Sequence, residues 1–186
     1  MKIENVQVYG LNDSIRRAKF PMSVDTDSLN DTLTEGIRKL AKSRAGEGHD
    51  NWLNGVVVQF DVTGSLKWWT EAQRYHFLDF VSSQSTMHRI TKFDIEEQCN
   101  EYVLADTIRN LTILVALYNA DPTPEKYLRV LYNIPTGFRL TAGMTTNYRQ
   151  LKTIYKQRKN HRLPEWREFC EWIETLPYAE LIVGVQ

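Results

Sequence analysis

The chain has 186 residues, and its 23 Lys or Arg side chains balance its 23 Asp or Glu side chains to a formal net charge of zero. Proteins that coat DNA or bind membranes through a polybasic surface need a net positive field, so this balance disfavours both classes. Hydrophobic residues make up 42% and charged residues 25%, which is typical of a folded globular protein. We expect a single domain over residues 1–186.

The two cysteines predict neither a disulfide framework nor a metal site. Cys99 and Cys170 form no CxxC pair and have no His at ligand spacing, so no bound metal is expected. No apolar run approaches the roughly 20 residues that a membrane helix needs, and residues 1–11 lack the apolar stretch of a signal peptide. We therefore expect a cytoplasmic protein without a membrane partner.

The periodicity of apolar residues predicts a mixture of strands and helices. In chain order, the patterns predict a strand over 2–9, helices over 15–20 and 28–42, a strand over 55–62, helices over 66–80, 94–118 and 124–133, a short β segment over 136–144, helices over 145–157 and 164–176, and a final strand over 179–185. Ser14 is expected to cap the first helix, and Thr63-Gly64-Ser65 to end the second strand. This order lacks regular strand–helix–strand alternation, so it predicts an α+β or irregular α/β fold.

Residues 74–89 gather polar side chains directly after an apolar stretch. This segment carries Ser82, Gln84, Ser85, His88 and Arg89. Hydroxyl, amide and guanidinium donors suit a phosphate group and the edge of a base. The alternative is a capped polar loop without a ligand. Nearby aromatic residues are expected in the core or at an interface rather than as a stacking surface, namely Trp68, Trp69, Phe77 and Phe80.

Residues 145–167 are a local concentration of positive charge in a neutral chain. The basic residues are Arg149, Lys152, Lys156, Arg158, Lys159, Arg162 and Arg167. Asn147 is placed at the start of a helix, where free N–H groups and the helix dipole favour anions. Asn147 and Arg158 are three helical turns apart, so both can lie on one helix face. The alternative is a solvated basic face, which is common.

The spacing in this second segment is more specific than its charge. It reads P-(x11)-N-x-R-x-L-(x6)-R-(x2)-H-(x4)-W-R, carried by Pro135, Asn147, Arg149, Leu151, Arg158, His161, Trp166 and Arg167. This pattern resembles the C-terminal half of the flavin-dependent thymidylate synthases. Arg129 stands roughly where that family has an earlier nucleotide-binding arginine, although its spacing to Pro135 is about two residues longer than in the family. With the upstream order of segments, the resemblance covers about residues 2–175.

The sequence departs from the family signature R-H-R-x-x-S-x-N-E-x-S-x-R-Y. Ser82 and Arg89 match it, whereas Gln84 stands at the Asn and Ser85 at the Glu. The three residues Phe77, Leu78 and Asp79 replace Arg-His-Arg, which contacts flavin and nucleotide in the family. Each lost charge-assisted contact costs about 1.5–3 kcal/mol. These replacements argue against unchanged flavin and folate chemistry.

The resemblance implies a central mixed or antiparallel sheet flanked by helices, and a homotetramer with active sites between subunits. It implies FAD as cofactor and the methylation of dUMP with NADPH and methylenetetrahydrofolate, without a side-chain nucleophile, so no catalytic residue is assigned. The implied nucleotide-binding residues are Gln84, Ser85, Arg89, Arg129, Arg149 and Arg158. The implied cofactor-binding residues are His49, Arg74, Ser82 and Asn147.

Three functions are compatible with these residues. The first is a nucleotide enzyme that modifies a pyrimidine deoxynucleotide such as dUMP. The second is an inactive, oligomeric relative that binds a nucleotide or a protein, which the loss of Arg-His-Arg favours. The third is a nucleic-acid-binding protein that uses the basic residues of 149–167, which zero net charge disfavours.

Overall fold

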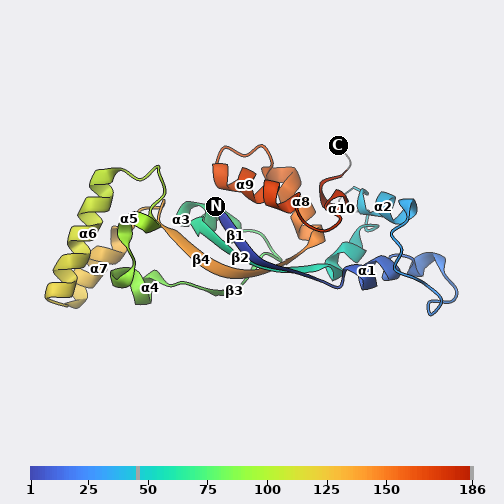
Figure 1. Cartoon of the computed structure of the whole chain (residues 1–186), viewed down its shortest axis with the longest axis horizontal. Coiled ribbons are helices and arrows are strands. Elements are labelled where there is room, and N and C mark those ends of the chain that lie inside the picture. Colours follow the sequence, from blue (N-terminus) through green and yellow to red (C-terminus); the bar gives the residue numbers. More distant parts are fainter. Residues whose placement is uncertain (45–46, 185–186) are drawn as a thin grey trace.

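The computed structural model describes residues 1–44 and 47–184. Four strands form one sheet in the order β1-β2-β4-β3, and every neighbouring pair is antiparallel. The strands are β1 (Lys2–Tyr9), β2 (Val57–Ser65), β3 (Asp79–Ser83) and β4 (Arg139–Asn147). The α+β class and the central antiparallel sheet are confirmed. Figure 1 shows the sheet in the middle of an elongated molecule, with helices at both ends and over one face.

One face of the sheet packs against helices and the other lacks such a cover. Side chains alternate along β2 and β4, so that Val58, Phe60 and Met144 are buried while Gln59 and Asp61 face the other side. The helices above the buried face are α3 (Leu66–Ala72), α8 (Tyr148–Arg158), α9 (Pro164–Ile173) and α10 (Glu180–Val183). Their apolar side chains and the sheet form the larger hydrophobic cluster.

A second hydrophobic cluster lies at one end of the molecule. It is built around Leu111, Val130 and Phe138. The helices at this end are α4 (Thr86–Arg89), α5 (Ile95–Gln98), α6 (Ala105–Ala120) and α7 (Pro124–Tyr132). At the opposite end lie α1 (Leu11–Arg17) and α2 (Glu35–Ala41), as Figure 1 shows. None of the helices in the described ranges is long and apolar enough to cross a membrane.

The first two predicted helices are displaced from their expected positions. Helix α1 begins at Leu11 after Gly10, whose φ of 70° lies in the left-handed region, so Ser14 lies buried inside the helix and does not cap it. Helix α2 begins only after Thr34, which caps it, and residues 28–34 are not helical. Asn30 accepts a hydrogen bond from the amide of Thr32, a local turn that competes with a helix.

The segment 63–83 also differs from its prediction. Strand β2 continues through Thr63-Gly64-Ser65, because Gly64 lets Trp68 pack closely: a Cβ there would lie 2.9 Å from Trp68 Cε3. The helix predicted over 66–80 ends at Ala72. Residues 79–83 instead form edge strand β3, which pairs with β4.

Three further boundaries are wrong for local reasons. The helix predicted over 94–118 is interrupted because Cys99 forms an isolated bridge with Phe138. Thr145 and Thr146 belong to β4 rather than to the next helix. The tail forms helix α10 instead of a strand. Val185 of that predicted strand lies outside the described residues, as do residues 45–46 of the loop after α2.

Candidate functional site

A basic cavity lies where β4 passes into α8. Its volume is about 730 Å³, and its walls come from the end of α2, residues 43–44, 50, 54 and 77, Asn147, helix α8 and residues 181–184. Among its described lining residues, six are basic and one, Asp50, is acidic. The basic ones are Lys42, Arg44, Arg149, Lys152, Lys156 and Lys159. We call this the α8 cavity. Its size lies within the range of small-molecule sites, and its charge favours an anion.

The turn from β4 into α8 is held by Asn147. Its side-chain oxygen accepts a hydrogen bond from the amide of Gln150 at 2.8 Å, so Asn147 lies at the start of the helix, as the sequence predicts, and caps it. The next amide, that of Tyr148, donates to the carbonyl of Val56 at 3.0 Å. The oxygen of Asn147 is therefore committed to the helix, and its NH₂ group is the part that remains for a ligand.

Asp50 and Lys152 clamp the segment after α2 onto α8. The Asp50 carboxylate is only 4% exposed and accepts from Arg149 Nε at 3.2 Å and from Lys152 Nζ at 2.7 Å. Lys152 Nζ also donates to the carbonyls of Ala41 and Ser43 at 2.7 and 2.8 Å, so all three of its N–H groups are used. Lys152 is thus structural, whereas Arg149 keeps its two terminal nitrogens for a ligand.

The other cations of the α8 cavity are less committed. The side chains of Lys42, Arg44 and Lys156 form no hydrogen bond or ion pair with the described residues. Lys159 Nζ lies 5.7 Å from the centre of the Tyr155 ring. His49 precedes Asp50 in the chain but is exposed and does not line the cavity among the described residues. The cavity therefore offers Lys42, Arg44, Lys156 and the terminal nitrogens of Arg149 as its uncommitted cations, and of these Arg149 and Lys156 lie on α8.

A second group of predicted residues lies at the end of edge strand β3. It comprises Ser82, Gln84, Ser85 and Arg89, which we call the β3-edge group. Gln84 acts as a further strand residue: its amide donates to the carbonyl of Thr141, and its side-chain oxygen accepts from the Thr141 amide, both at 2.9 Å. Arg89 is exposed at the end of α4.

The structure does not join these two groups within one chain. Gln84 pairs with Thr141 near the start of β4, whereas α8 follows the last residue of β4, Asn147. Six residues of strand span roughly 20 Å, and Figure 1 shows α4 and α8 at opposite ends of β4. Arg129 lies on α7, where it is exposed and pairs with Glu125 at 2.7 Å.

Arg158 belongs to neither group. Its guanidinium is held by an ion pair and hydrogen bonds, and it does not line the α8 cavity among the described residues. Its Nη1 donates to Glu71 at 3.0 Å and its Nε to the Tyr75 hydroxyl at 2.6 Å. Its guanidinium also lies 4.8 Å from the centre of the Trp166 ring. The expectation that Asn147 and Arg158 serve one site is not met within one chain, because only Asn147 lines the cavity. Arg74 is exposed just after α3.

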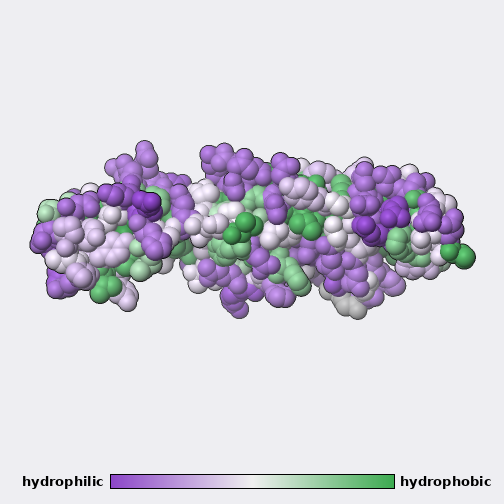
Figure 2. Space-filling model, turned by 90° about the horizontal axis from the view of Figure 1, so that it is seen from below, coloured by the Kyte–Doolittle hydropathy of each residue, from purple (hydrophilic) through white to green (hydrophobic). Residues whose placement is uncertain are grey.

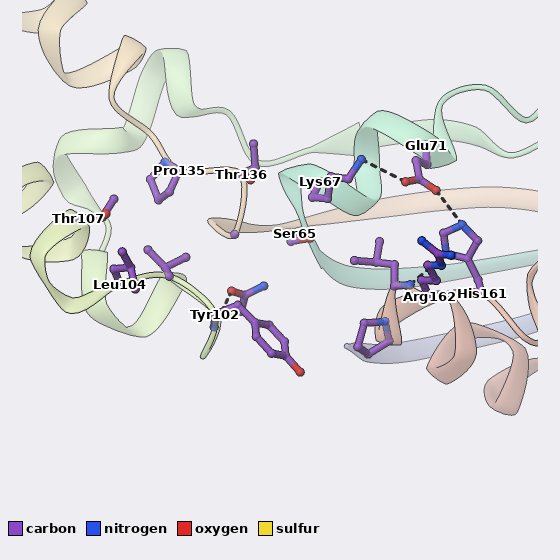
Figure 3. Close-up of a pocket in the computed structure, with 15 residues that line it drawn as sticks. Ser65, Lys67, Glu71, Tyr102, Leu104, Thr107, Pro135, Thr136, His161 and Arg162 are labelled. Carbon is purple, nitrogen blue, oxygen red and sulfur yellow. Dashed lines mark hydrogen bonds and ion pairs between the residues drawn. The ribbon is translucent and has the colours of Figure 1, made fainter.

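A second cavity, of about 780 Å³, opens between the two hydrophobic clusters. Figure 3 shows Lys67, Glu71 and His161 on one side of it and Tyr102 and Pro135 on the other. Glu71 lies 3.2 Å from Lys67 Nζ and 3.6 Å from His161 Nε2. None of the ten residues predicted to bind nucleotide or cofactor lines it among the described residues.

Sequence reasoning missed several residues of the α8 cavity, among them Lys42, Arg44, Asp50 and Phe77. Asp50 has no local signal, because its partner Lys152 is 102 residues away in the chain. Phe77 lines the cavity and is 51% exposed, so it does not belong to the core. Its only signal was that it replaces an arginine of the family signature.

The cysteines are not nucleophile candidates: burial, together with nearby Glu174 and Glu171, raises the pKa of the Cys170 thiol to about 12.

The fold is that of the flavin-dependent thymidylate synthases. The structure of ThyX from Helicobacter pylori complexed with FAD and dUMP has a TM-score of 0.78 and 16% identity, and the match covers 98% of each chain. A second structure of that enzyme with FAD and dUMP gives 0.78 and 15% over the same shares. The UMP/dUMP methylase PolB from Streptomyces cacaoi, bound with 5-Br dUMP, gives 0.63 and 14% over 94% of this chain and 88% of that one. No protein-family model and no curated protein matches the sequence.

Proposed function

We propose that this chain binds a nucleotide in the α8 cavity, with the phosphate on Arg149 and Lys156. The observation that carries the proposal is the excess of basic side chains around a cavity of ligand size, in the fold of nucleotide enzymes. Asp50 supports this reading, because it orients Arg149 through Nε and leaves the guanidinium fork toward the ligand. One phosphate needs only a few such contacts, so a neutral chain is no obstacle.

We further propose that the bound nucleotide is either a pyrimidine deoxynucleotide, such as dUMP, or the cofactor FAD. The residues fit both in charge, since Arg149 and Lys156 suit one phosphate or a diphosphate, and Asn147 offers its NH₂ group to a carbonyl. FAD would supply the redox chemistry of the methylation, with NADPH and methylenetetrahydrofolate as the other reactants. The chain's own residues would bind and orient the ligands.

The complete site would form between copies of this chain in the cytoplasm. The β3-edge group and the α8 cavity are too far apart in one chain to share a nucleotide, so a second copy would have to bring them together. Exposed apolar residues support such contacts: Phe80 and Val81 lie on edge strand β3, and Tyr9 on β1. Figure 2 shows hydrophobic patches in the middle of the molecule on the face seen from below. A homotetramer is the proposed assembly.

Thermal unfolding with added ligand tests the proposed binding. At a hundredfold excess over Kd, a ligand that binds the folded state stabilises it by about 2.7 kcal/mol. We expect dUMP or FAD to do so, and flavin to give the purified protein a visible absorption band.

Lys156→Met should weaken binding about 10-fold or more, because a hydrogen bond to a charged group contributes about 1.5–3 kcal/mol. Lys156 forms no pair in the described chain, so its loss should leave folding intact.

The matched control is Arg109→Met, which removes an exposed cation of α6 that pairs with Asp106. It should leave ligand affinity unchanged. A protein that no nucleotide or flavin stabilises would refute the proposal.

A second candidate is an oligomeric relative that binds the nucleotide without converting it. The observation that favours it is the replacement of three signature residues by Phe77, Leu78 and Asp79, of which Leu78 is buried and cannot contact a ligand. Saturating dUMP with no methyl transfer, under conditions where FAD, NADPH and methylenetetrahydrofolate are all present, would favour this candidate.

A further inference from the structure

Phe77 is a large aromatic side chain that the fold leaves half-exposed. It is 51% exposed and lines the α8 cavity together with Arg149 and Lys156. The ring of His76 packs beside it, with ring centres 4.1 Å apart and planes tilted by 47°. An aromatic face next to cations is the combination that binds a flat ring carrying a phosphate.

The backbone at Phe77 is strained. Its φ of 65° lies in the left-handed region, where a bulky aromatic residue is an outlier and glycine is the usual residue. Such conformations persist only where the surroundings fix them, and they concentrate at ligand-binding sites.

The residues on either side of Phe77 fix this conformation. The Tyr75 hydroxyl donates to Gln157 on α8 at 2.8 Å, and the Tyr75 ring packs edge-on against Trp166 with ring centres 5.6 Å apart. Leu78 is buried in the larger hydrophobic cluster. With Tyr75 and Leu78 anchored, the two residues between them, His76 and Phe77, are exposed, and the Leu78 amide donates to the Tyr75 carbonyl at 3.4 Å across the turn that carries Phe77.

We propose that Phe77 stacks on the flat heteroaromatic ring of the ligand whose phosphate Arg149 and Lys156 hold. This inference rests on the proposed function and names the part of the ligand that the cavity recognises besides its phosphate. A phenyl ring has no hydrogen-bond donor, so it recognises the face of a ring and not its edge. The family has an arginine at this position of its signature, which would add charge. In this chain Phe77 favours ligands with a large, flat ring, so a flavin binds more tightly than a pyrimidine.

Two probes that share a phosphate separate stacking from charge: flavin mononucleotide (FMN) and ribose 5-phosphate. Phe77→Ala should weaken FMN binding by between about 5- and 150-fold, the range for loss of one aromatic–base stack. It should leave ribose 5-phosphate binding unchanged. Phe77→Tyr should bind FMN like the parent chain. Lys156→Met should weaken both probes.

Phe77→Gly distinguishes binding from a structural role. Glycine removes the strain at φ 65°, so this variant should unfold at the same or a higher temperature than the parent chain while losing FMN affinity. The matched control is Tyr132→Ala, because Tyr132 is also an exposed aromatic residue but lies at the end of α7, outside the described cavity lining.

The outcomes are distinct. If the parent chain binds FMN and Phe77→Ala binds it equally well, the stacking role is overturned and the proposed function stands. If Phe77→Ala weakens both probes equally, Phe77 shapes the cavity and does not stack. If the parent chain binds dUMP but not FMN, the stacking proposal fails, and if it binds no nucleotide or flavin at all, the proposed function itself fails.

Discussion

Replacing Asp50 by alanine lowers the free energy of unfolding by about 3–5 kcal/mol, the cost of removing one partner of a buried charge pair. The Asp50 carboxylate is buried and is the acceptor that Arg149 and Lys152 share. Without it, Lys152 is left with two backbone carbonyls and an uncompensated charge. Urea unfolding followed by circular dichroism measures the change.

Two further variants test whether the loss of stability comes from the buried charge pair. Asp106→Ala removes an exposed ion pair with Arg109 and should cost less than about 1 kcal/mol. The double variant Asp50→Ala with Lys152→Met should recover part of the loss, because it removes the unpaired charge as well. A loss below 1 kcal/mol for Asp50→Ala alone would show that the clamp does not hold the segment after α2.

Replacing Glu71 by glutamine lowers the free energy of unfolding at neutral pH by about 2 kcal/mol, the middle of the range for hydrogen bonds to a charged group. The side chain is 18% exposed, accepts from Arg158 and from Trp166 Nε1 at 3.0 Å each, and pairs with Lys67. Glutamine keeps the shape but not the charge. The exposed residue Glu101 gives the control, since Glu101→Gln should change little.

The effect of Glu71→Gln should depend on pH. Burial by itself raises the pKa of Glu71, but hydrogen bonds from Lys67 and Trp166 and the charge of His161 outweigh it, so the pKa lies below its ordinary value of 4.5. A lowered folded-state pKa means that the carboxylate stabilises the fold fully above pH 4.5, and that this contribution is lost as the pH falls through the lowered value. The difference between parent and variant should therefore shrink below pH 4.5. A constant difference down to pH 2 would contradict this assignment.

The sequence predicts best those elements whose signals are local. Strand β1 follows from alternation, and α7 and α9 each begin with a proline in the first turn, at Pro124 and Pro164. Strand β3 could not be found this way, because all five of its residues are exposed and show no alternation of buried and exposed positions. Its strand character comes from pairing with β4, some 60 residues later.

The residues of the candidate site also divide into those with a local sequence signal and those without one. Asn147 caps a helix and Arg149 follows it closely, so local spacing identified both. Arg158 has the expected spacing, but its orientation depends on Glu71 and Tyr75, which precede it by more than 80 residues. Phe77 lines the cavity because a distant contact, from Tyr75 to Gln157, fixes the turn that carries it. Three-dimensional contacts of this kind leave no local pattern in a sequence.

The distance between the two groups along β4 has a consequence for genetics. If a working site takes its β3-edge group from one copy and its α8 cavity from another, then two chains with different defects can complement each other. A chain altered at Arg89 and a chain altered at Lys156 would each be inactive alone. Mixed in one assembly, they would regenerate a fraction of sites in which both groups are intact. Two inactive alleles could then restore function together, whereas two alleles damaged in the same group could not.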